Sequence, residues 1–134
     1  MADFAKLHVW RKAHALMLNV HRTCAGIRGA RYAGLRSQMF RAAMSIPTNI
    51  VEGRGQKSDK DFARFLGYAL NSTAELKYHL IIARDIRAIP LKDFNSLMAQ
   101  AIEVEKMLHG FIRSLTPTAP VTSTRRVTSR RRNA

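Results

Sequence analysis

A proline stands inside a stretch of the chain that otherwise has the spacing of an α-helix. Pro47 lies in the segment 45–53, and the apolar residues around it recur every three or four positions: Leu35, Met39, Ala42, Ala43, Ile46 and Ile50. Proline in a helix interior removes a backbone hydrogen bond and costs about 3 kcal/mol, so it marks a kink or a helix end. The segment therefore predicts a helix that bends at Pro47 or ends soon after it.

A polar stripe runs beside this apolar one. Its four members fall within roughly 60° of one another around a helix, at the edge of the apolar face. They are Gln38, Ser45, Asn49 and Glu52. An unpaired buried polar group costs about 1–3 kcal/mol, so we expect these side chains to have partners. Together with Pro47 and Gly53 they form a structural motif that shapes the packing of this helix and performs no chemistry.

Four amphipathic stretches predict four helices, over about residues 9–27, 35–51, 59–87 and 91–115. Glycines interrupt the chain after the first two, Ser58 is placed to cap the third, and Pro90 precedes the fourth. Helical spacing dominates throughout, and short connections favour antiparallel neighbours. The sequence thus predicts an all-α fold: an up-down-up-down antiparallel four-helix bundle over residues 1–115.

The hairpin between the second and third helices permits a prediction of register. A turn centred near Gln56 would place Ser45 opposite Gly67, where a missing side chain allows the backbones to approach closely. The same register would place Gln38 near Glu75. We therefore expect Glu75 to be a partner for the polar stripe.

Charge is distributed unevenly along the chain. The 23 Lys and Arg residues exceed the 9 Asp and Glu residues, which gives a net charge of +14. Residues 1–57 hold ten of the basic residues and two acidic ones, whereas residues 58–115 hold eight and seven. An excess of this size favours polyanionic partners.

The tail, residues 116–134, contains five arginines, two prolines and no hydrophobic periodicity, so we expect it to be a disordered electrostatic arm. Binding to the backbone of RNA or DNA fits the charge better than sequence-specific readout. Trp10 and most phenylalanines have core spacing, so the sequence predicts no base-stacking platform. The residues expected to contact nucleic acid are Arg11, Lys12, Arg22, Arg28, Arg31, Arg36, Arg41, Arg54, Lys57, Arg125, Arg126, Arg130, Arg131 and Arg132.

The third helix carries apolar residues outside its inward stripe. A helix of a simple bundle needs one apolar stripe, so a second one suggests that another subunit covers this surface. The predicted oligomer contacts are Leu70, Tyr78, Ile81 and Ile82. The alternative is a monomer in which this helix is the most central one.

Catalytic and metal-binding patterns are weak. The pairs Glu75–His79 and Glu105–His109 have i, i+4 spacing, whereas di-iron bundles use Glu-x-x-His at i, i+3 with further glutamates. His14 and His21 share a face but lack a third ligand. The single cysteine, Cys24, has core spacing and predicts a buried thiol. We expect no catalytic residue, metal or cofactor, and the absence of a signal peptide or an 18-residue apolar run predicts a soluble cytoplasmic protein.

The central motif, with the residues that precede it, resembles the bacterial four-helix bundle protein family. Further similarities are Leu7-His8-Val9-Trp10, Phe62-x-x-Phe65-Leu66 and Ala69-x-x-Ser72-x-x-Glu75-Leu76. Some members are encoded in intervening sequences of large-subunit ribosomal RNA genes, and the accessory variability proteins of diversity-generating retroelements look like structural relatives. The resemblance implies an up-down bundle, often a ring-like homopentamer, with basic surfaces suited to nucleic acid. It implies no known catalytic activity.

These observations predict a non-enzymatic, homo-oligomeric bundle that binds nucleic acid through the basic residues of its first two helices and its tail. A second hypothesis is an adaptor that docks on a nucleic-acid enzyme such as a reverse transcriptase. A remote third is a metal-dependent bundle enzyme.

Overall fold

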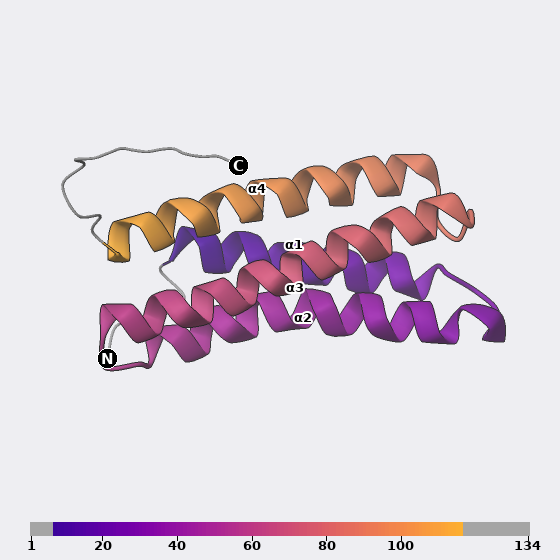
Figure 1. The fold of residues 1–134 in the computed structure, drawn as a ribbon. Helices are drawn as coiled ribbons and strands as arrows, with labels where there is room; N and C mark the ends of the chain where they lie inside the picture. Colours follow the sequence, from indigo (N-terminus) through magenta and orange to yellow (C-terminus); the bar gives the residue numbers. More distant parts are fainter. Residues whose placement is uncertain (1–6, 117–134) are drawn as a thin grey trace, which may run out of the picture.

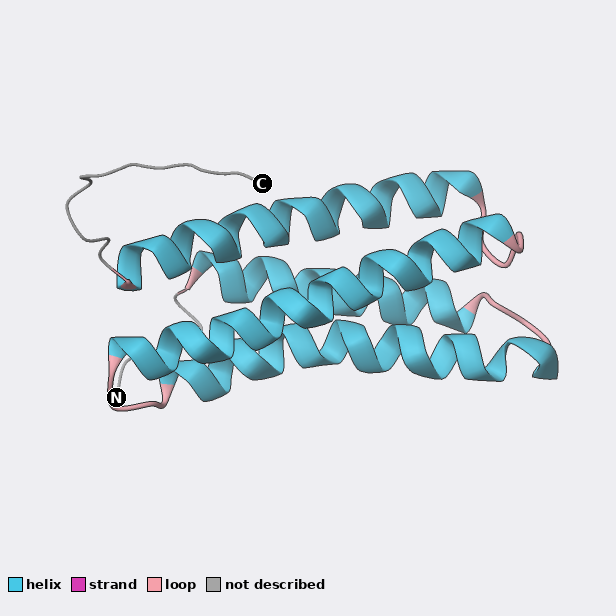
Figure 2. Ribbon diagram, in the orientation of Figure 1, coloured by secondary structure: helices cyan, strands magenta, loops and turns pink. Residues whose placement is uncertain are grey.

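The computed structural model of the chain describes residues 7–116, and these form four long antiparallel helices (Figure 1). The helices are α1 (His8–Ala25), α2 (Ala33–Arg54), α3 (Asp59–Asp85) and α4 (Leu91–Leu115), with a short 3-10 helix, η2 (Ala30–Tyr32), before α2. Short loops join them, and no strand occurs in this part of the chain (Figure 2). The predicted all-α bundle is confirmed. Apart from Thr116, the predicted arginine-rich tail lies outside the described residues.

The four helices pack in a ring that follows the order of the sequence. Each helix contacts the next one, and α4 closes the ring against α1. The core consists of apolar side chains at the inward positions of all four helices, each worth about 1.5–3 kcal/mol when buried. The largest fully buried apolar side chains are Leu16, Met39, Ile46, Ile50, Leu66, Leu76, Leu80, Leu108, Val20 and Val104.

The ends of the helices follow local capping chemistry. The Ser58 hydroxyl accepts a hydrogen bond from the backbone N–H of Asp61 at 3.1 Å, which confirms the predicted cap of α3. Gly29 has a φ of 101°, a conformation that glycine adopts without strain, in the connection between α1 and α2. The helix boundaries differ from the predicted ones by two or three residues: α1 and α3 end earlier, and α2 begins earlier and continues to Arg54.

α2 continues without interruption through Pro47, which is buried. Side-chain donors supply extra hydrogen bonds to the turn that precedes the proline. The Thr48 hydroxyl donates to the Met44 carbonyl at 2.8 Å, and the Asn49 amide donates to the Ser45 carbonyl at 2.9 Å. These bonds stabilise a turn that proline weakens by lacking an N–H.

The polar stripe of α2 divides into two parts. Asn49 also donates to the Ser45 hydroxyl at 3.0 Å, and this hydroxyl is 2.7 Å from the hydroxyl of Ser72 on α3. Ser45 and Asn49 are half-buried and hydrogen-bonded, as the stripe predicted. Gln38 and Glu52, by contrast, are exposed, so the expectation that they sit at the core edge was wrong.

The predicted register between α2 and α3 was also wrong. Ser45 meets Ser72 rather than Gly67, a shift of more than one helical turn. Glu75 approaches His79 of its own helix, and Gln38 makes no hydrogen bond to it in the described structure. Side chains lean toward the N-terminus of their helix, so in an antiparallel pair the residues that meet lie later in both helices than a count from the turn suggests.

Close approach between α2 and α3 occurs at Gly53 instead. A Cβ placed on Gly53 would lie 2.8 Å from the Phe65 Cβ and 2.8 Å from a ring carbon of Phe62, whereas one on Gly67 would meet nothing within 4 Å. The sequence had suggested that the helix ends just before Gly53. In the structure Gly53 is buried and lies inside α2. The small residue that lets the backbones approach is therefore the glycine of the proline motif.

Candidate nucleic-acid interface

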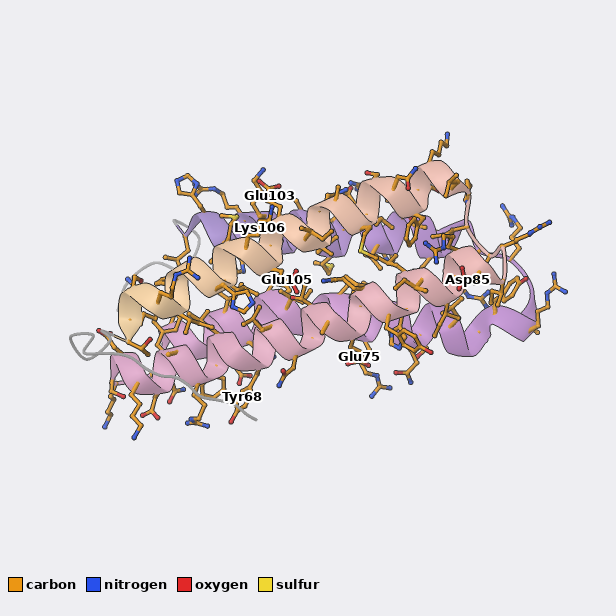
Figure 3. All side chains as sticks on the ribbon, turned by 45° about the horizontal axis from the view of Figure 1, so that its top comes forward. Tyr68, Glu75, Asp85, Glu103, Glu105 and Lys106 are labelled. Carbon is orange, nitrogen blue, oxygen red and sulfur yellow. The ribbon has the colours of Figure 1, made fainter. Side chains whose placement is uncertain are left out.

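The half of the bundle formed by α1, its connection and α2 is almost free of acidic residues. α1 and residues 26–32 contain none, and α2 contains one, Glu52. Seven acidic residues lie on residues 58–115, and Figure 3 shows Glu75 and Asp85 on α3 and Glu103 and Glu105 on α4. The positive charge of the first half is therefore not neutralised by carboxylates within the same two helices.

The ion pairs show the same asymmetry. Of the five between described residues, four lie within α3 and α4, including Lys77–Glu105 at 3.1 Å. The fifth joins Lys12 of α1 to Glu103 of α4 at 3.5 Å, and both side chains are about half exposed. Lys12 is therefore the one predicted contact residue that appears in this set of ion pairs.

Arg36 has a structural role that the sequence analysis did not foresee. Its guanidinium donates to the carbonyl oxygens of Ile27 and Gly29, both at 3.0 Å, and so fixes the connection between α1 and α2. The side chain is half-buried, and the two carbonyls occupy part of its donor capacity. Arg36 therefore has fewer free N–H donors than a fully exposed arginine.

Three other predicted arginines contact their own neighbourhood and remain exposed. Arg11 lies 3.0 Å from the ring nitrogen of His8, Arg22 donates to the Asn19 side chain, and Arg31 lies over the Tyr32 ring at 4.7 Å. Such local contacts hold a guanidinium in place at the surface. These side chains are therefore positioned cations on the surface of α1 and the connection.

The remaining predicted residues of the described part fall into two groups. Arg28, Arg41 and Lys57 are exposed. Arg54 is half-buried over the Phe62 ring at 5.8 Å, and its Nε is buried without a hydrogen-bond partner. Arg54 thus belongs to the packing at the end of α2. The predicted arginines of the tail, Arg125, Arg126, Arg130, Arg131 and Arg132, lie outside the described residues.

The seam between α1 and α2 is hollowed at two places. One hollow of about 280 Å³ is lined by Trp10, His14, Met17, Met44, Pro47, Thr48 and Val51. The other, of about 400 Å³, is lined by His21, Cys24, Ala25, Ala33, Arg36, Ser37 and Phe40. We call the two together the α1–α2 groove. No carboxylate lines either hollow.

Aromatic and imidazole rings border this groove in pairs. The rings of Trp10 and His14 are stacked with their centroids 5.0 Å apart, and those of His21 and Phe40 lie 5.2 Å apart. Trp10 and Phe40 are only half-buried. The sequence analysis took Trp10 for a core residue, because it lies at the edge of the inward stripe. Residues 10, 14 and 17 have the i, i+4, i+7 spacing of one helix face, and this spacing could have predicted the ring-lined surface.

The metal-site patterns of the sequence do not assemble in the bundle. Within residues 7–116 there is no group of three or more His, Cys, Asp or Glu side chains that could hold a metal ion. Glu75 pairs with His79 at 4.0 Å, but Glu105 pairs with Lys77 and not with His109. The predicted helical pair Glu105–His109 is thus replaced by an ion pair between α3 and α4.

The thiol of Cys24 is buried, as predicted. Burial raises its pKa above the ordinary value, and the nearby charge of Arg36 opposes this shift. A thiol with a raised pKa is a poor nucleophile near neutral pH. Cys24 accordingly belongs to the core beneath the α1–α2 groove.

The residues predicted to contact another subunit differ in exposure. Leu70 and Ile81 are half-buried and pack against the core of the same chain. Ile82 is half-buried, and Tyr78 is 62% exposed. Tyr78 therefore has the most exposed surface of this set.

Two comparisons relate the chain to known proteins. The sequence model of the 23S rRNA-intervening sequence protein family matches residues 5–110. Among solved structures, a protein of unknown function from the S23 ribosomal protein family of Bacteroides thetaiotaomicron is 23% identical, with a TM-score of 0.74 over 78% of this chain and 98% of that one. At this identity the likeness shows a shared fold. A search of curated proteins gives no match. None of the helices within residues 7–116 combines the length and apolarity needed to cross a lipid bilayer.

Proposed function

The chain belongs to the 23S rRNA-intervening sequence protein family, and on this premise we propose that it is a non-enzymatic, homo-oligomeric bundle that binds nucleic acid. The interface is the basic surface of α1, the α1–α2 connection and α2, together with the tail. The distribution of acidic residues carries the proposal: one acid in these two helices against seven in residues 58–115.

The chemistry of this surface suits phosphates. Arg22, Arg28, Arg31 and Arg41 are exposed cations on one half of the molecule, and like charges so arranged repel one another unless a polyanion neutralises them. Contacts of this kind release counterions from nucleic acid and do not depend on sequence. We infer that the protein recognises backbone and shape, and the RNA named in the description of its family is the first ligand to test.

The decisive experiment is a fluorescence-anisotropy titration of single- and double-stranded RNA and DNA at low and near-physiological salt. The wild-type protein is compared with Arg41→Glu and with Lys106→Glu, which reverses a charge on the exposed side of α4 (Figure 3). We expect Arg41→Glu to weaken binding and to reduce the slope of log affinity against log salt by about 0.7–0.9 for each phosphate that the variant no longer binds. Lys106→Glu makes the same change in net charge and should have a much smaller effect.

Equal reductions in affinity for the two variants would show that only net charge matters and would contradict an interface on α1 and α2. A form ending at Leu115 separates the contribution of the tail. If binding survives this truncation, the bundle itself holds the site. If binding disappears, nucleic acid contacts only the arm.

An adaptor is the second candidate. The exposed Tyr78 on the outer side of α3 favours a protein partner. In that case the chain alone binds nucleic acid weakly, and affinity appears when the partner enzyme is present. Tyr78→Asp, followed by light scattering, distinguishes self-assembly from this role, because only a surface used between copies changes the mass of the particle.

A further inference from the structure

The α1–α2 groove carries two pairs of rings in surroundings free of carboxylates. One wall of its first hollow presents Trp10 and His14, and the second hollow is lined by His21, Phe40 and Arg36. The α1 residues that line the first hollow and those that line the second are centred about ten residues apart, or roughly 15 Å along the helix. The two ring pairs are therefore arranged in series along one seam.

We propose that the α1–α2 groove binds unpaired nucleobases of a single-stranded segment, which stack on the exposed parts of these rings. The inference rests on the proposed function and specifies its ligand: single-stranded in preference to duplex nucleic acid. Bases stack on aromatic and imidazole rings in many single-strand binding proteins, and this contact tolerates any sequence because every base has a flat face.

The exposure of the rings supports this use of the groove. Trp10, His14 and Phe40 are half-buried, and His21 is exposed, so each ring leaves part of its surface open to a ligand. Met44 on the opposite wall of the first hollow is 44% exposed. The groove therefore offers apolar, ring-lined surface that is partly exposed.

Charge complementarity selects the occupant. No acidic residue lines the seam, Arg36 lines its second hollow, and Arg41 is exposed on α2. A third hollow lies on the other flank of α1, against α4, and is lined by Arg22 and Asp93 with polar side chains such as Asn19 and Gln100. The α1–α2 seam therefore combines rings with positive charge and no carboxylate, whereas the hollow without rings holds an arginine and a carboxylate. An anionic strand with flat bases matches this combination.

The proline motif gains a second role from this arrangement. Pro47 lines the first hollow together with Thr48. The Thr48 hydroxyl is already bonded to the Met44 carbonyl, so its hydrogen-bond capacity is partly used within the helix. The α2 wall beside Trp10 is consequently mostly apolar, and it favours a flat base over a hydrated phosphate.

Trp10 provides the measurement, because it is the single tryptophan of the chain. Its fluorescence is recorded during titration of the full-length protein with a short oligouridine strand and with the matching duplex. Anisotropy of a labelled strand reports total binding in parallel. We expect the single strand to quench Trp10 fluorescence in proportion to binding, and the duplex to bind with little quenching.

Phe40→Leu tests the second hollow, with Tyr68→Leu as the matched removal of a partly exposed ring on α3. Loss of one stacked base should lower single-strand affinity by about tenfold for Phe40→Leu and leave duplex affinity nearly unchanged. Tyr68→Leu should leave both unchanged. Circular dichroism establishes that each variant is folded, and the wild-type quenching measurement does not depend on either variant.

Each other outcome overturns the inference at a different level. Salt-sensitive binding without Trp10 quenching, and without a preference for single strands, means contact with the backbone alone, so the proposed function stands and the groove is not used. Absence of any binding removes both proposals. A third outcome is that Trp10 is shielded from acrylamide in an oligomer and becomes accessible on dilution. A second copy of the chain would then occupy the groove, which excludes bases from it.

Discussion

α2 has two flanks, and they differ in how closely they pack against the neighbouring helix. Against α3 the flank is closed: Gly53 lies under Phe62 and Phe65, and the Ser45 and Ser72 hydroxyls are 2.7 Å apart. Against α1 the flank is open, with half-buried rings around two hollows. We call these the closed seam and the open seam.

The difference shows how one helix can divide its tasks. The closed seam uses small and short polar side chains, which bring backbones together and leave no surface for a ligand. The open seam uses rings and long side chains, which hold the helices apart at the surface and leave hollows between them. Stability should therefore depend on the closed seam, and binding on the open one. Substitutions of similar size on the two flanks can separate these contributions.

The largest contrast should come from two glycines that the same substitution affects in opposite directions. Gly53→Ala places a Cβ 2.8 Å from the Phe65 Cβ, which overpacks the closed seam. Overpacking costs about 1–3 kcal/mol, of which the better helix propensity of alanine returns at most about 1 kcal/mol. Gly67→Ala meets open space, so it should stabilise the protein by about 0.5–1 kcal/mol.

Urea unfolding followed by circular dichroism measures both variants. If Gly67→Ala destabilised the protein and Gly53→Ala had no effect, the helices would approach closely at Gly67, as the turn predicted. The close approach at Gly53 would then be contradicted. Neither variant should change the affinity of the folded protein for nucleic acid.

Asn49→Leu should have the next largest effect. Its side-chain amide donates to both the carbonyl and the hydroxyl of Ser45, in the turn that Pro47 weakens. Loss of these bonds should cost about 1–2 kcal/mol of unfolding free energy, because a half-buried group loses its partner. Gln38→Leu is the control on the same stripe: its side chain is exposed, and a change within about 0.5 kcal/mol is expected.

The measurement is again the unfolding midpoint in urea, with light scattering to follow assembly. A variant Asn49→Leu of normal stability and normal mass would contradict a structural role for the motif. Weaker nucleic-acid binding at normal stability would instead assign Asn49 to the interface.

The architecture could be predicted from the sequence because it depends on periodicity. Four apolar stripes, the Ser58 cap and Pro90 define the helices to within a few residues, and the buried positions follow from the stripes. The register between α2 and α3 could not be obtained in this way. It depends on the lean of side chains along each helix and on the contact of Gly53 with Phe62 and Phe65, and neither can be read from the spacing of apolar residues.

The positive charge of the candidate site was predictable from the sequence, but the contacts of its individual side chains were not. The acid-poor first half is plain from the sequence, whereas the contacts of Arg36 with two carbonyls require the path of the connection in space. The groove was missed for a related reason. Trp10 has the spacing of a core residue, and only the packing of α2 against α1 decides how much of its ring remains uncovered. Residues at the edge of an apolar stripe are thus the least predictable part of a bundle.

Arg36→Met tests whether residues of the open seam that stabilise the fold differ from those that bind nucleic acid. Removing a guanidinium that donates to the Ile27 and Gly29 carbonyls should cost about 1 kcal/mol of unfolding free energy. Arg41→Met removes an exposed arginine of the same helix and should change stability by less than about 0.5 kcal/mol. In nucleic-acid titrations the order should reverse, with Arg41→Met the more damaging of the two. Equal effects in both measurements would mean that the seam does not separate structure from binding.

The smallest effect should be a pH dependence that arises from Cys24 beneath the open seam. Burial raises the pKa of this thiol, so the folded chain holds its proton to higher pH than the unfolded chain does. The contribution to stability is therefore constant below the unfolded pKa of about 8.5, and it declines as pH rises above that value. The difference in unfolding free energy between the wild type and Cys24→Ser, measured from about pH 7 to about pH 10, isolates this decline from the titration of lysines and tyrosines. Because the charge of Arg36 opposes the shift, the same difference measured in an Arg36→Met background should decline more steeply. A flat difference in both backgrounds would mean that water reaches the thiol freely, and the hollow above it would then be deeper than the packing of α1 against α2 indicates.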